Sequence, residues 1–312
     1  MAFRASFECL WCGRSWSTRG PDDIEGFAQL CPDCIGRAGE NGFLRYRFRA
    51  ALAERARASP APVDALGPPE ELARGAPLAD DLSAEMVAYY EARADEYDHW
   101  YLRRGRYGHG PVHDAAWQAE LDQATRWLDG LPIGGEIVEL AAGTGWWSPL
   151  LAAKGELSVY DLAGAPLERA RARLLAHGLR AHIHVRDAWE RPDRTVDALF
   201  CGFWLSHVAG DRLASFLDLA RRWLRPGGLF AFIDSRSDPR SGAVDQPPTD
   251  AADVAAGIVR RRLADGREFR VPKVIREPAE LEAALRVAGF EVVGVDATAR
   301  FFVLGSARAP VP

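Results

Sequence analysis

From residue 81 onward, short apolar runs alternate with segments whose apolar residues recur at helical spacing. The runs predict strands at residues 137–140, 157–161, 183–189, 196–202 and 229–235. Helices are expected between them at residues 146–153, 165–177 and 212–223, the last one capped by Asp211. Apolar residues are nearly continuous at 137–140, as in a strand that is buried on both faces of a sheet. The alternation predicts an α/β fold with a mostly parallel sheet.

Further elements are predicted on both sides of this alternation. Ser83 is the expected N-cap of a helix that runs to Tyr97. The remaining expected elements are a helix at 115–128, a mobile polar loop at 236–256, a hairpin of residues 258–263 and 268–275, a helix at 278–288, and an antiparallel pair of strands at 291–298 and 301–306. Together these elements form one expected domain at residues 81–312.

The first 80 residues have a different composition. Residues 43–58 predict an arginine-rich helix, whose basic face is more simply a solvated surface than an RNA contact. Residues 60–80 are rich in proline, as linkers often are. We therefore expect a small module at residues 1–59, a linker at 60–80 and a large domain at 81–312.

The strand at 137–140 runs into a glycine turn, which predicts a nucleotide-binding crevice. Gly143 and Gly145 allow a sharp turn and a close approach of the backbone to a ligand, because a Cβ atom would block it. The helix after the turn, ended by Gly155 at its C-cap, would direct its N-terminus at the ligand. The dinucleotide fingerprint Gly-x-Gly-x-x-Gly fits poorly, since Ser148 occupies its third glycine position.

The residues around this turn resemble motif I of the class I S-adenosylmethionine (SAM) methyltransferases. That motif reads acidic-x-Gly-x-Gly-x-Gly, and residues 139–145 read Glu-x-Ala-x-Gly-x-Gly. Other family features follow in order: Asp161 at the end of the second strand, Asp-Ala at 187–188, and a Leu-x-Pro-Gly-Gly turn at 224–228. The resemblance covers residues 82–312 and implies a Rossmann-like sheet with an antiparallel last strand.

The resemblance also implies a cofactor site. Asp161 would accept both ribose hydroxyls, Asp187 would bind the adenine amino group, and Trp189 would pack against the adenine ring. The implied SAM-binding residues are Tyr97, Glu139, Ala141, Gly143, Gly145, Asp161, Leu162, Asp187, Ala188, Trp189 and Phe203. Two plainer interpretations remain open: Asp161 as a helix N-cap, and residues 83–97 as an ordinary amphipathic helix.

Methyl transfer from SAM depends mainly on the positioning of donor and acceptor, so no fixed catalytic residue is expected. His207 is a candidate base, although a structural role is the favoured interpretation. The Asn/Asp-Pro-Pro-Tyr pattern of enzymes that act on nucleic-acid amines is absent after the fourth strand, where Gly-Phe-Trp-Leu stands. These features favour a small-molecule acceptor, which would enter under residues 97–113 and the 258–275 hairpin.

Two alternatives stay open. The chain could be an RNA or protein methyltransferase that recognises its substrate through residues 1–59, or a SAM-binding scaffold without activity. The intact glycine turn and Asp161 count against the scaffold. A formal net charge of −5 argues against a dedicated polyanion binder. No apolar run reaches the roughly 18 residues that a membrane span requires, and no signal peptide is visible, so we expect a cytoplasmic protein.

Four of the five cysteines form two tight pairs. Cys9, Cys12, Cys31 and Cys34 stand in the pattern Cys-x2-Cys-x18-Cys-x2-Cys. Four thiolates at this spacing can hold one Zn²⁺ tetrahedrally, so we expect a zinc-ribbon-like module. A segment of this size has too small a core to fold alone, and the metal would stabilise it.

Replacing Cys31 with Ser should unfold residues 1–40 locally and leave SAM binding unchanged. All four ligands would be thiolates, so the zinc would have no open position for catalysis. Metal analysis of the purified protein should give one zinc per chain, and well below one in Cys31→Ser. Zinc that persists after two of the four cysteines are removed would contradict the site.

Overall fold

The structure, a computed structural model, describes residues 6–8, 15–17 and 80–311. The chain divides into two compact units, Met1–Glu70 and Glu71–Pro312.

In the first unit, strand β1 (Ser6–Glu8) pairs antiparallel with β2 (Ser15–Ser17), and Phe7 stands opposite Trp16 in the register. The four paired cysteines and the arginine-rich segment at 43–58 lie outside the described residues. The zinc-ribbon-like module therefore stays a prediction.

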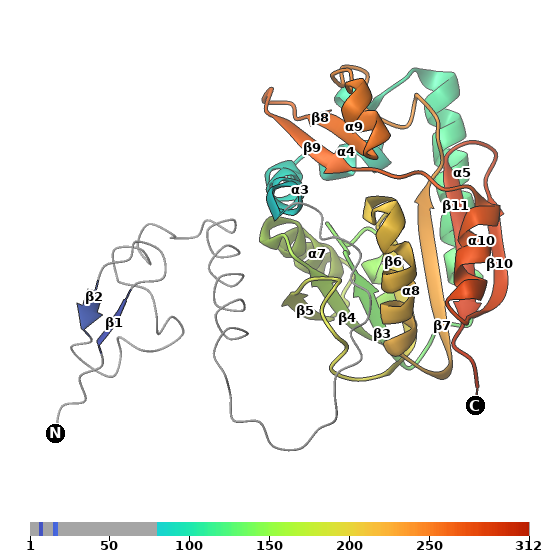
Figure 1. Cartoon of the computed structure of the whole chain (residues 1–312). Helices are drawn as coiled ribbons and strands as arrows, with labels where there is room; N and C mark the ends of the chain where they lie inside the picture. The colour runs from blue at the N-terminus through green and yellow to red at the C-terminus, as the bar shows by residue number, and fades with distance from the viewer. Residues whose placement is uncertain (1–5, 9–14, 18–79, 312) are drawn as a thin grey trace. The chain divides into compact units, whose positions relative to one another are not determined.

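A seven-stranded sheet forms the centre of the second unit (Figure 1). Its strands lie in the order β10-β11-β7-β6-β3-β4-β5. Their bounds are β3 Glu136–Leu140, β4 Glu156–Asp161, β5 His182–Val185, β6 Val196–Gly202, β7 Leu224–Ser235, β10 Glu291–Ala297 and β11 Phe302–Arg308. Strands β5, β4, β3, β6 and β7 are parallel, whereas β11 is antiparallel to both of its neighbours. This arrangement confirms the predicted α/β fold with an antiparallel last strand.

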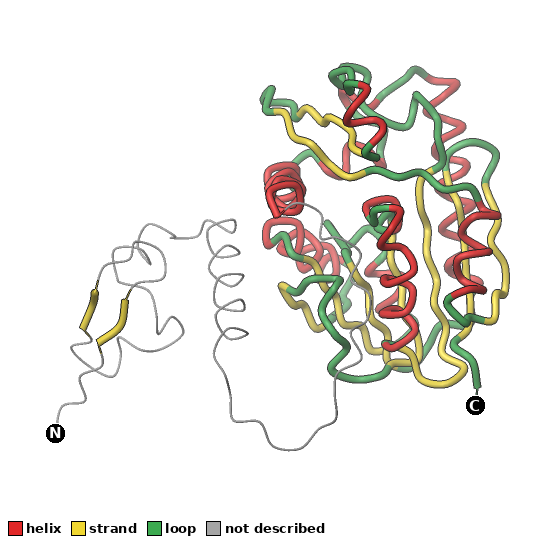
Figure 2. The backbone as a smooth tube through the Cα atoms, viewed as in Figure 1, coloured by secondary structure: helices red, strands yellow, loops and turns green. Residues whose placement is uncertain are grey.

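Helices cover both faces of the sheet (Figures 1 and 2). One face carries α5 (Pro111–Gly130), α6 (Ser148–Ala152) and α7 (Gly164–Ala176), and the other carries α8 (Leu213–Arg222) and α10 (Pro278–Val287). Ile137 belongs to the same buried cluster as Trp117 of α5, while Val138 clusters with Phe216 of α8. Successive residues of β3 thus face opposite helix layers, which explains its continuous apolar pattern.

A third group of segments lies beyond the carboxyl ends of the parallel strands (Figure 1). It consists of α3 (Asp80–Arg93), α4 (Tyr97–Tyr101), α9 (Ala251–Ala255) and the predicted hairpin, here β8 (Ile258–Arg262) and β9 (Glu268–Pro272). We call this group the cap. Helix α3 packs on β9, with the rings of Tyr89 and Phe269 5.6 Å apart between centroids. The cap therefore covers the edge of the sheet at which α/β folds bind ligands.

Some predicted element ends were wrong. Ser83 lies inside α3 and does not cap it, and that helix stops before Tyr97, which opens α4. Helix α6 ends before Gly155, so this glycine is not its C-cap. A Cβ atom at Gly155 would lie 2.3 Å from the carbonyl oxygen of Gly135, so close packing of the backbone requires glycine there.

Three further predictions differ from the structure. Asp211 lies in a short 3-10 turn, and its side chain does not cap α8. Strand β5 ends at Val185, so residues 186–189 form a turn rather than the end of the strand. The segment 236–256, predicted as a loop, contains α9. Among the helices that the structure describes, none is long and apolar enough to cross a membrane.

Candidate functional site

The turn that follows β3 consists largely of left-handed backbone. Ala141, Gly143 and Gly145 have φ angles of +51°, +56° and +67°. A Cβ atom at Gly145 would lie 2.6 Å from the Cβ of Ala170 in α7, so only glycine lets the turn pack on that helix. A Cβ atom at Gly143 would lie 3.6 Å from the ring of Tyr97, in the space between the turn and the cap. The turn therefore leaves its backbone open on the side that faces Tyr97.

Asp161, the last residue of β4, holds this turn in place. Its Oδ2 accepts the Gly143 N–H at 2.8 Å, and its Oδ1 accepts the Ala163 N–H at 2.8 Å. Each oxygen keeps a lone pair for another donor. Burial raises the pKa of Asp161 to about 6, although both hydrogen bonds act in the opposite direction. The N-cap residue of α7 is Ala163 and not Asp161, so the helix-cap interpretation of this carboxylate does not apply.

Glu139 lies beneath the turn. It is 1% exposed and accepts a hydrogen bond from the Ser148 hydroxyl at the start of α6. Burial raises the pKa of Glu139 to about 8, so this carboxyl is mostly protonated near neutral pH. Glu139 therefore connects β3 to α6 and does not face a ligand.

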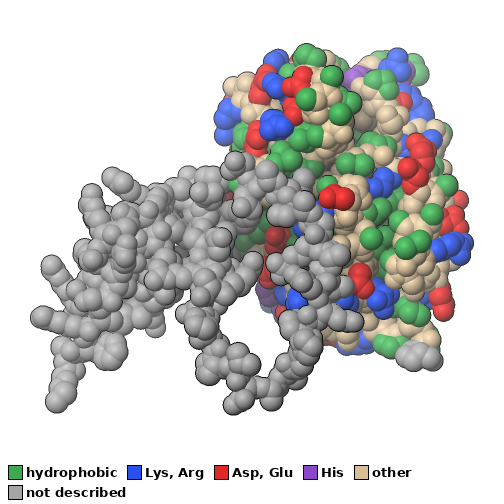
Figure 3. All heavy atoms as spheres, viewed as in Figure 1, with side chains coloured by type: hydrophobic (Ala, Val, Ile, Leu, Met, Phe, Trp, Pro, Cys, Tyr) green, Lys and Arg blue, Asp and Glu red, His purple; other side chains and the backbone are tan. Residues whose placement is uncertain are grey.

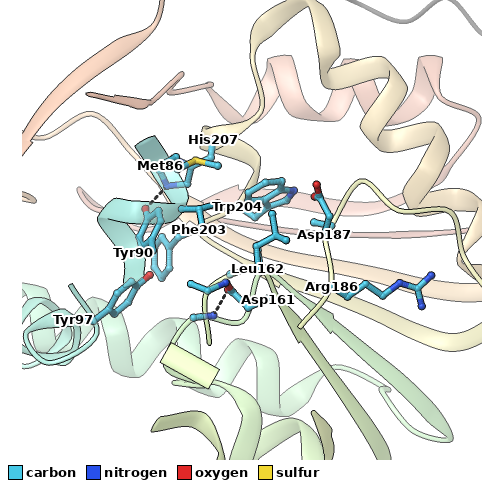
Figure 4. A pocket seen from close by; sticks show the side chains of 16 residues that line it. Met86, Tyr90, Tyr97, Asp161, Leu162, Arg186, Asp187, Phe203, Trp204 and His207 are labelled. Carbon is cyan, nitrogen blue, oxygen red and sulfur yellow. Dashed lines mark hydrogen bonds between the residues drawn. The ribbon is translucent and has the colours of Figure 1, made fainter. Parts of the chain in front are cut away.

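A cavity opens where the turn, Asp161 and the cap meet (Figure 4). Its volume is about 580 Å³, with the open mouth included. Most of the residues predicted for the cofactor site line it: Tyr97, Ala141, Gly143, Asp161, Leu162, Asp187, Ala188 and Phe203, together with the candidate base His207. Three predicted residues, Glu139, Gly145 and Trp189, do not line it.

Trp189 packs away from this cavity. Its ring lies 5.4 Å from that of Phe216 in α8, and the Arg212 guanidinium lies 3.8 Å from its ring centroid. The backbone N–H of Trp189 donates to Asp187 Oδ1 at 2.9 Å. Burial raises the pKa of Asp187, while this hydrogen bond and Arg212 oppose the shift. The turn after β5 thus presents Asp187 to the cavity and directs the indole toward α8.

Seven residues that line the cavity were not predicted for the site, among them four large side chains from the cap and from the turn after β6. Met86, Val87 and Tyr90 come from α3, and Trp204 follows β6. No motif marks them. Met86 and Tyr90 are four residues apart and so lie on one face of the helix, which was the one available signal.

A second cavity, of about 570 Å³ with its open mouth included, adjoins the first. Tyr90, Tyr97, Phe203 and His207 line both cavities, and we call these four residues the shared wall. The remaining lining residues are Tyr89, Arg93, Trp100, Tyr107, Ser235, Ser241, Gly242, Ala243, Gln246, Arg261 and Lys273. Part of this lining comes from residues 97–113 and from the hairpin, the two segments that the sequence predicts to lie over an acceptor.

Phe203 reaches the shared wall through an unusual backbone conformation. Its φ is +59°, which is rare for a bulky residue and costs free energy. The Phe203 N–H donates to the Ile233 carbonyl at 2.7 Å, and its ring lies 4.8 Å from that of Trp100. Strained residues of this kind tend to occur at functional sites, where surrounding contacts hold them.

His207 and Tyr90 form a hydrogen-bonded pair in the shared wall (Figure 4). His207 Nδ1 lies 2.6 Å from the Pro272 carbonyl oxygen, which only accepts, so Nδ1 carries the hydrogen. Burial and the nearby Lys273 lower the pKa of His207 well below its usual value, and the ring is neutral. Nε2 therefore accepts the hydrogen bond of the Tyr90 hydroxyl at 2.7 Å.

The left-handed backbone at Ala141 yields a stability prediction. Ala141→Gly should raise the free energy of unfolding by about 1 kcal/mol, because glycine adopts this φ without the clash of a Cβ atom. Thermal unfolding should show a Tm higher by roughly 2–4 °C. Ala142→Gly is the matched control, since its φ is negative, and it should lower the Tm. An unchanged Tm in Ala141→Gly would contradict the predicted strain.

Comparisons with known proteins agree with this geometry. Residues 137–228 match the family described as "Methyltransferase domain". The demethylmenaquinone methyltransferase of Clavibacter sepedonicus is 33% identical over 131 residues, which are 41% of this chain and 50% of that protein. The dimethylglycine N-methyltransferase of Parasynechococcus marenigrum is 38% identical over 112 residues, 34% of this chain and 39% of that protein. The chain thus spans half or less of the length of these curated relatives.

Two solved structures match over a longer stretch. A DhpI–SAH complex is 32% identical, with a TM-score of 0.56, over 74% of this chain and 98% of that one. A DhpI–SAM–HEP complex is also 32% identical, with a TM-score of 0.57, over 74% of this chain and 99% of that one. The match covers nearly the whole of these relatives. The glycine turn, the acid that ends β4 and the sheet order agree with it, and the chain belongs to the class I SAM-dependent methyltransferases.

Proposed function

We propose that the chain transfers a methyl group from SAM to a small molecule in the second cavity. The observation that carries this proposal is the shared wall: two cavities of similar size meet at Tyr90, Tyr97, Phe203 and His207. A donor in one cavity and an acceptor in the other would meet there, which supplies the proximity that methyl transfer needs. The names of the curated relatives, a demethylmenaquinone and a dimethylglycine methyltransferase, support a small-molecule acceptor rather than RNA or protein.

The residues of the first cavity fit SAM. Asp161 offers a free lone pair on each oxygen for two ribose hydroxyls, and Asp187 can accept from the adenine amino group. The open backbone at Gly143 leaves room that a side chain would fill. When bound, SAM would supply a methyl group on a sulfonium: an acceptor atom would bond to the methyl carbon while the S–CH3 bond breaks and the neutral thioether leaves. The residues of the chain would bind the donor and the acceptor, orient them toward each other and exclude water.

The Tyr90–His207 pair has a positioning role in this proposal. Both ring nitrogens of His207 are already hydrogen-bonded, so the imidazole holds the Tyr90 hydroxyl at the shared wall. A direct role as base would require that Tyr90 move away from Nε2. If kcat fell a hundredfold or more in His207→Gln while KM and SAM affinity stayed unchanged, His207 would be the base instead.

The zinc site at Cys9, Cys12, Cys31 and Cys34 is also part of the proposal. The antiparallel pairing of β1 with β2, on either side of the first two cysteines in sequence, supports a knuckle there. Residues 1–59 as a recognition module for RNA or protein remain the alternative function. On the visible face of the second unit, side chains of both charges are interspersed, so this face adds no basic surface to such a module (Figure 3).

Asp161 should make SAM binding depend on pH. The pKa of its carboxyl is raised to about 6, and the ribose hydroxyls need the ionised form, so affinity should rise with pH through 6 and then level off. Asp161→Ala should weaken binding by about 1–3 kcal/mol. Calorimetry between pH 5 and 8 measures both effects.

Asp161→Asn is the control for this titration, since it should flatten the pH dependence near 6. The pKa of the Asp187 carboxyl is also raised, so Asp187→Asn measures how much of the pH dependence comes from that residue. SAM affinity that is unaltered in Asp161→Ala would remove this residue from the cofactor site.

The small-molecule acceptor can be tested with labelled SAM. The full chain should transfer label to a low-molecular-weight cell extract, and deletion of residues 1–59 should leave that transfer largely intact, because both cavities lie in the second unit. Label that appears only in RNA or protein fractions, and that is lost on the deletion while SAM still binds, would favour the alternative.

A further inference from the structure

We propose that the acceptor carries an oxyanion, a carboxylate or a phosphoryl group, which Arg93, Arg261 and Lys273 bind together. The inference deepens the proposed function and rests on it. These three cationic side chains line the second cavity and not the first. The lining of the second cavity contains neither aspartate nor glutamate. Its charged surface is therefore entirely positive.

Arg93 is a buried cation without a charged partner. It ends α3 and is 8% exposed. Its guanidinium carbon lies 4.4 Å from the ring centroid of Tyr97, and Tyr89 and Tyr107 lie at 5.5 and 5.6 Å. Among the described residues it forms no ion pair, and its Nε has no hydrogen-bond partner. Tyrosine faces stabilise a cation only modestly, so a burial of this degree calls for an anion.

Arg261 differs from the arginines on both sides of it in β8. Arg260 pairs with Asp250 at 3.0 Å, and Arg262 pairs with Glu268 at 2.6 Å. Arg261 lines the cavity, and no carboxylate of the described residues pairs with it. Arg260 thus pairs with the start of α9 and Arg262 pairs within the hairpin, while Arg261 faces the second cavity.

Lys273 follows β9 and adds a compact charge with hydroxyl groups beside it. Its Nζ donates to Ser206 Oγ at 2.7 Å and to Ser235 Oγ at 3.2 Å. The nearby carboxylate of Asp234 accepts the backbone N–H groups of Ser206 and Ser235. One ammonium hydrogen of Lys273 is left for a ligand.

The three cations come from α3, β8 and the segment after β9, so the folded cap gathers them around one space. Two guanidinium groups and one ammonium are the donors that carboxylates and phosphoryl groups bind most strongly. The aromatic rings of Tyr89, Trp100 and Tyr107 line the same space and exclude water, which strengthens each ion pair. An oxyanion held there keeps the acceptor beside the shared wall.

The test uses the full chain, labelled SAM and a low-molecular-weight extract. At neutral pH an anion-exchange resin divides the extract into retained, anionic molecules and unretained ones. We expect label to enter molecules from the retained fraction. Arg261→Gln and Lys273→Gln should each lower kcat/KM for that acceptor at least tenfold, with SAM affinity unchanged. Arg260→Gln, the matched control in the same strand, should change kcat/KM less than threefold.

The outcomes separate the two proposals. Transfer only to unretained molecules, or an Arg261→Gln enzyme as active as Arg260→Gln, would overturn the oxyanion site and leave the proposed function standing. Transfer to no small molecule, while SAM binds normally, would overturn the proposed function and this inference with it. Unchanged SAM affinity in each variant shows that it is folded.

Discussion

The hydrogen bond from the Gly143 N–H to the Asp161 carboxylate joins the end of β3 to the end of β4. A turn with left-handed φ at three of five positions leaves backbone N–H groups that the sheet cannot satisfy. The buried carboxylate satisfies one of them and stays available to a ligand on its other lone pairs. Because both strands end at the same edge of a parallel sheet, this bond also fixes where a nucleotide can lie. The position of the cap follows, since it must close over that edge.

The cap encloses two adjoining cavities beyond the sheet. Helix α3 and α4 bring Tyr90 and Tyr97 over the turn, and the left-handed Phe203 completes the wall between the cavities. The conformation of Phe203 is unfavourable by itself, and the packing of its ring against Trp100 and the bond to Ile233 offset that cost. The fold thus uses backbone strain at the point where the two reacting groups would meet.

Much of this arrangement could be predicted from the sequence, because it depends on local patterns. A continuous apolar strand, a glycine turn and an acid at the end of the next strand are each readable within a few residues, and they predicted the sheet and the place of Asp161. Trp189 was less predictable: its direction depends on Phe216 and Arg212, which belong to a later part of the chain. Tyr90 lies in the site because α3 packs on the hairpin. A short sequence pattern does not predict a contact between segments so far apart in the chain.

Charge is divided between the two cavities. The first has the carboxylates of Asp161 and Asp187, and its one arginine, Arg186, pairs with Glu190 and Asp193 and points away from the cavity (Figure 4). The second has three cations and no acid. A sulfonium donor and an anionic acceptor would each meet a wall of opposite charge. The cations of the second cavity also help to keep His207 neutral. Burial lowers its pKa most, and Lys273, Arg261 and Arg93 lower it further. An oxyanion among those cations would offset their charge and so lower the pKa of His207 less. The pKa of His207 would then depend on whether the acceptor is bound.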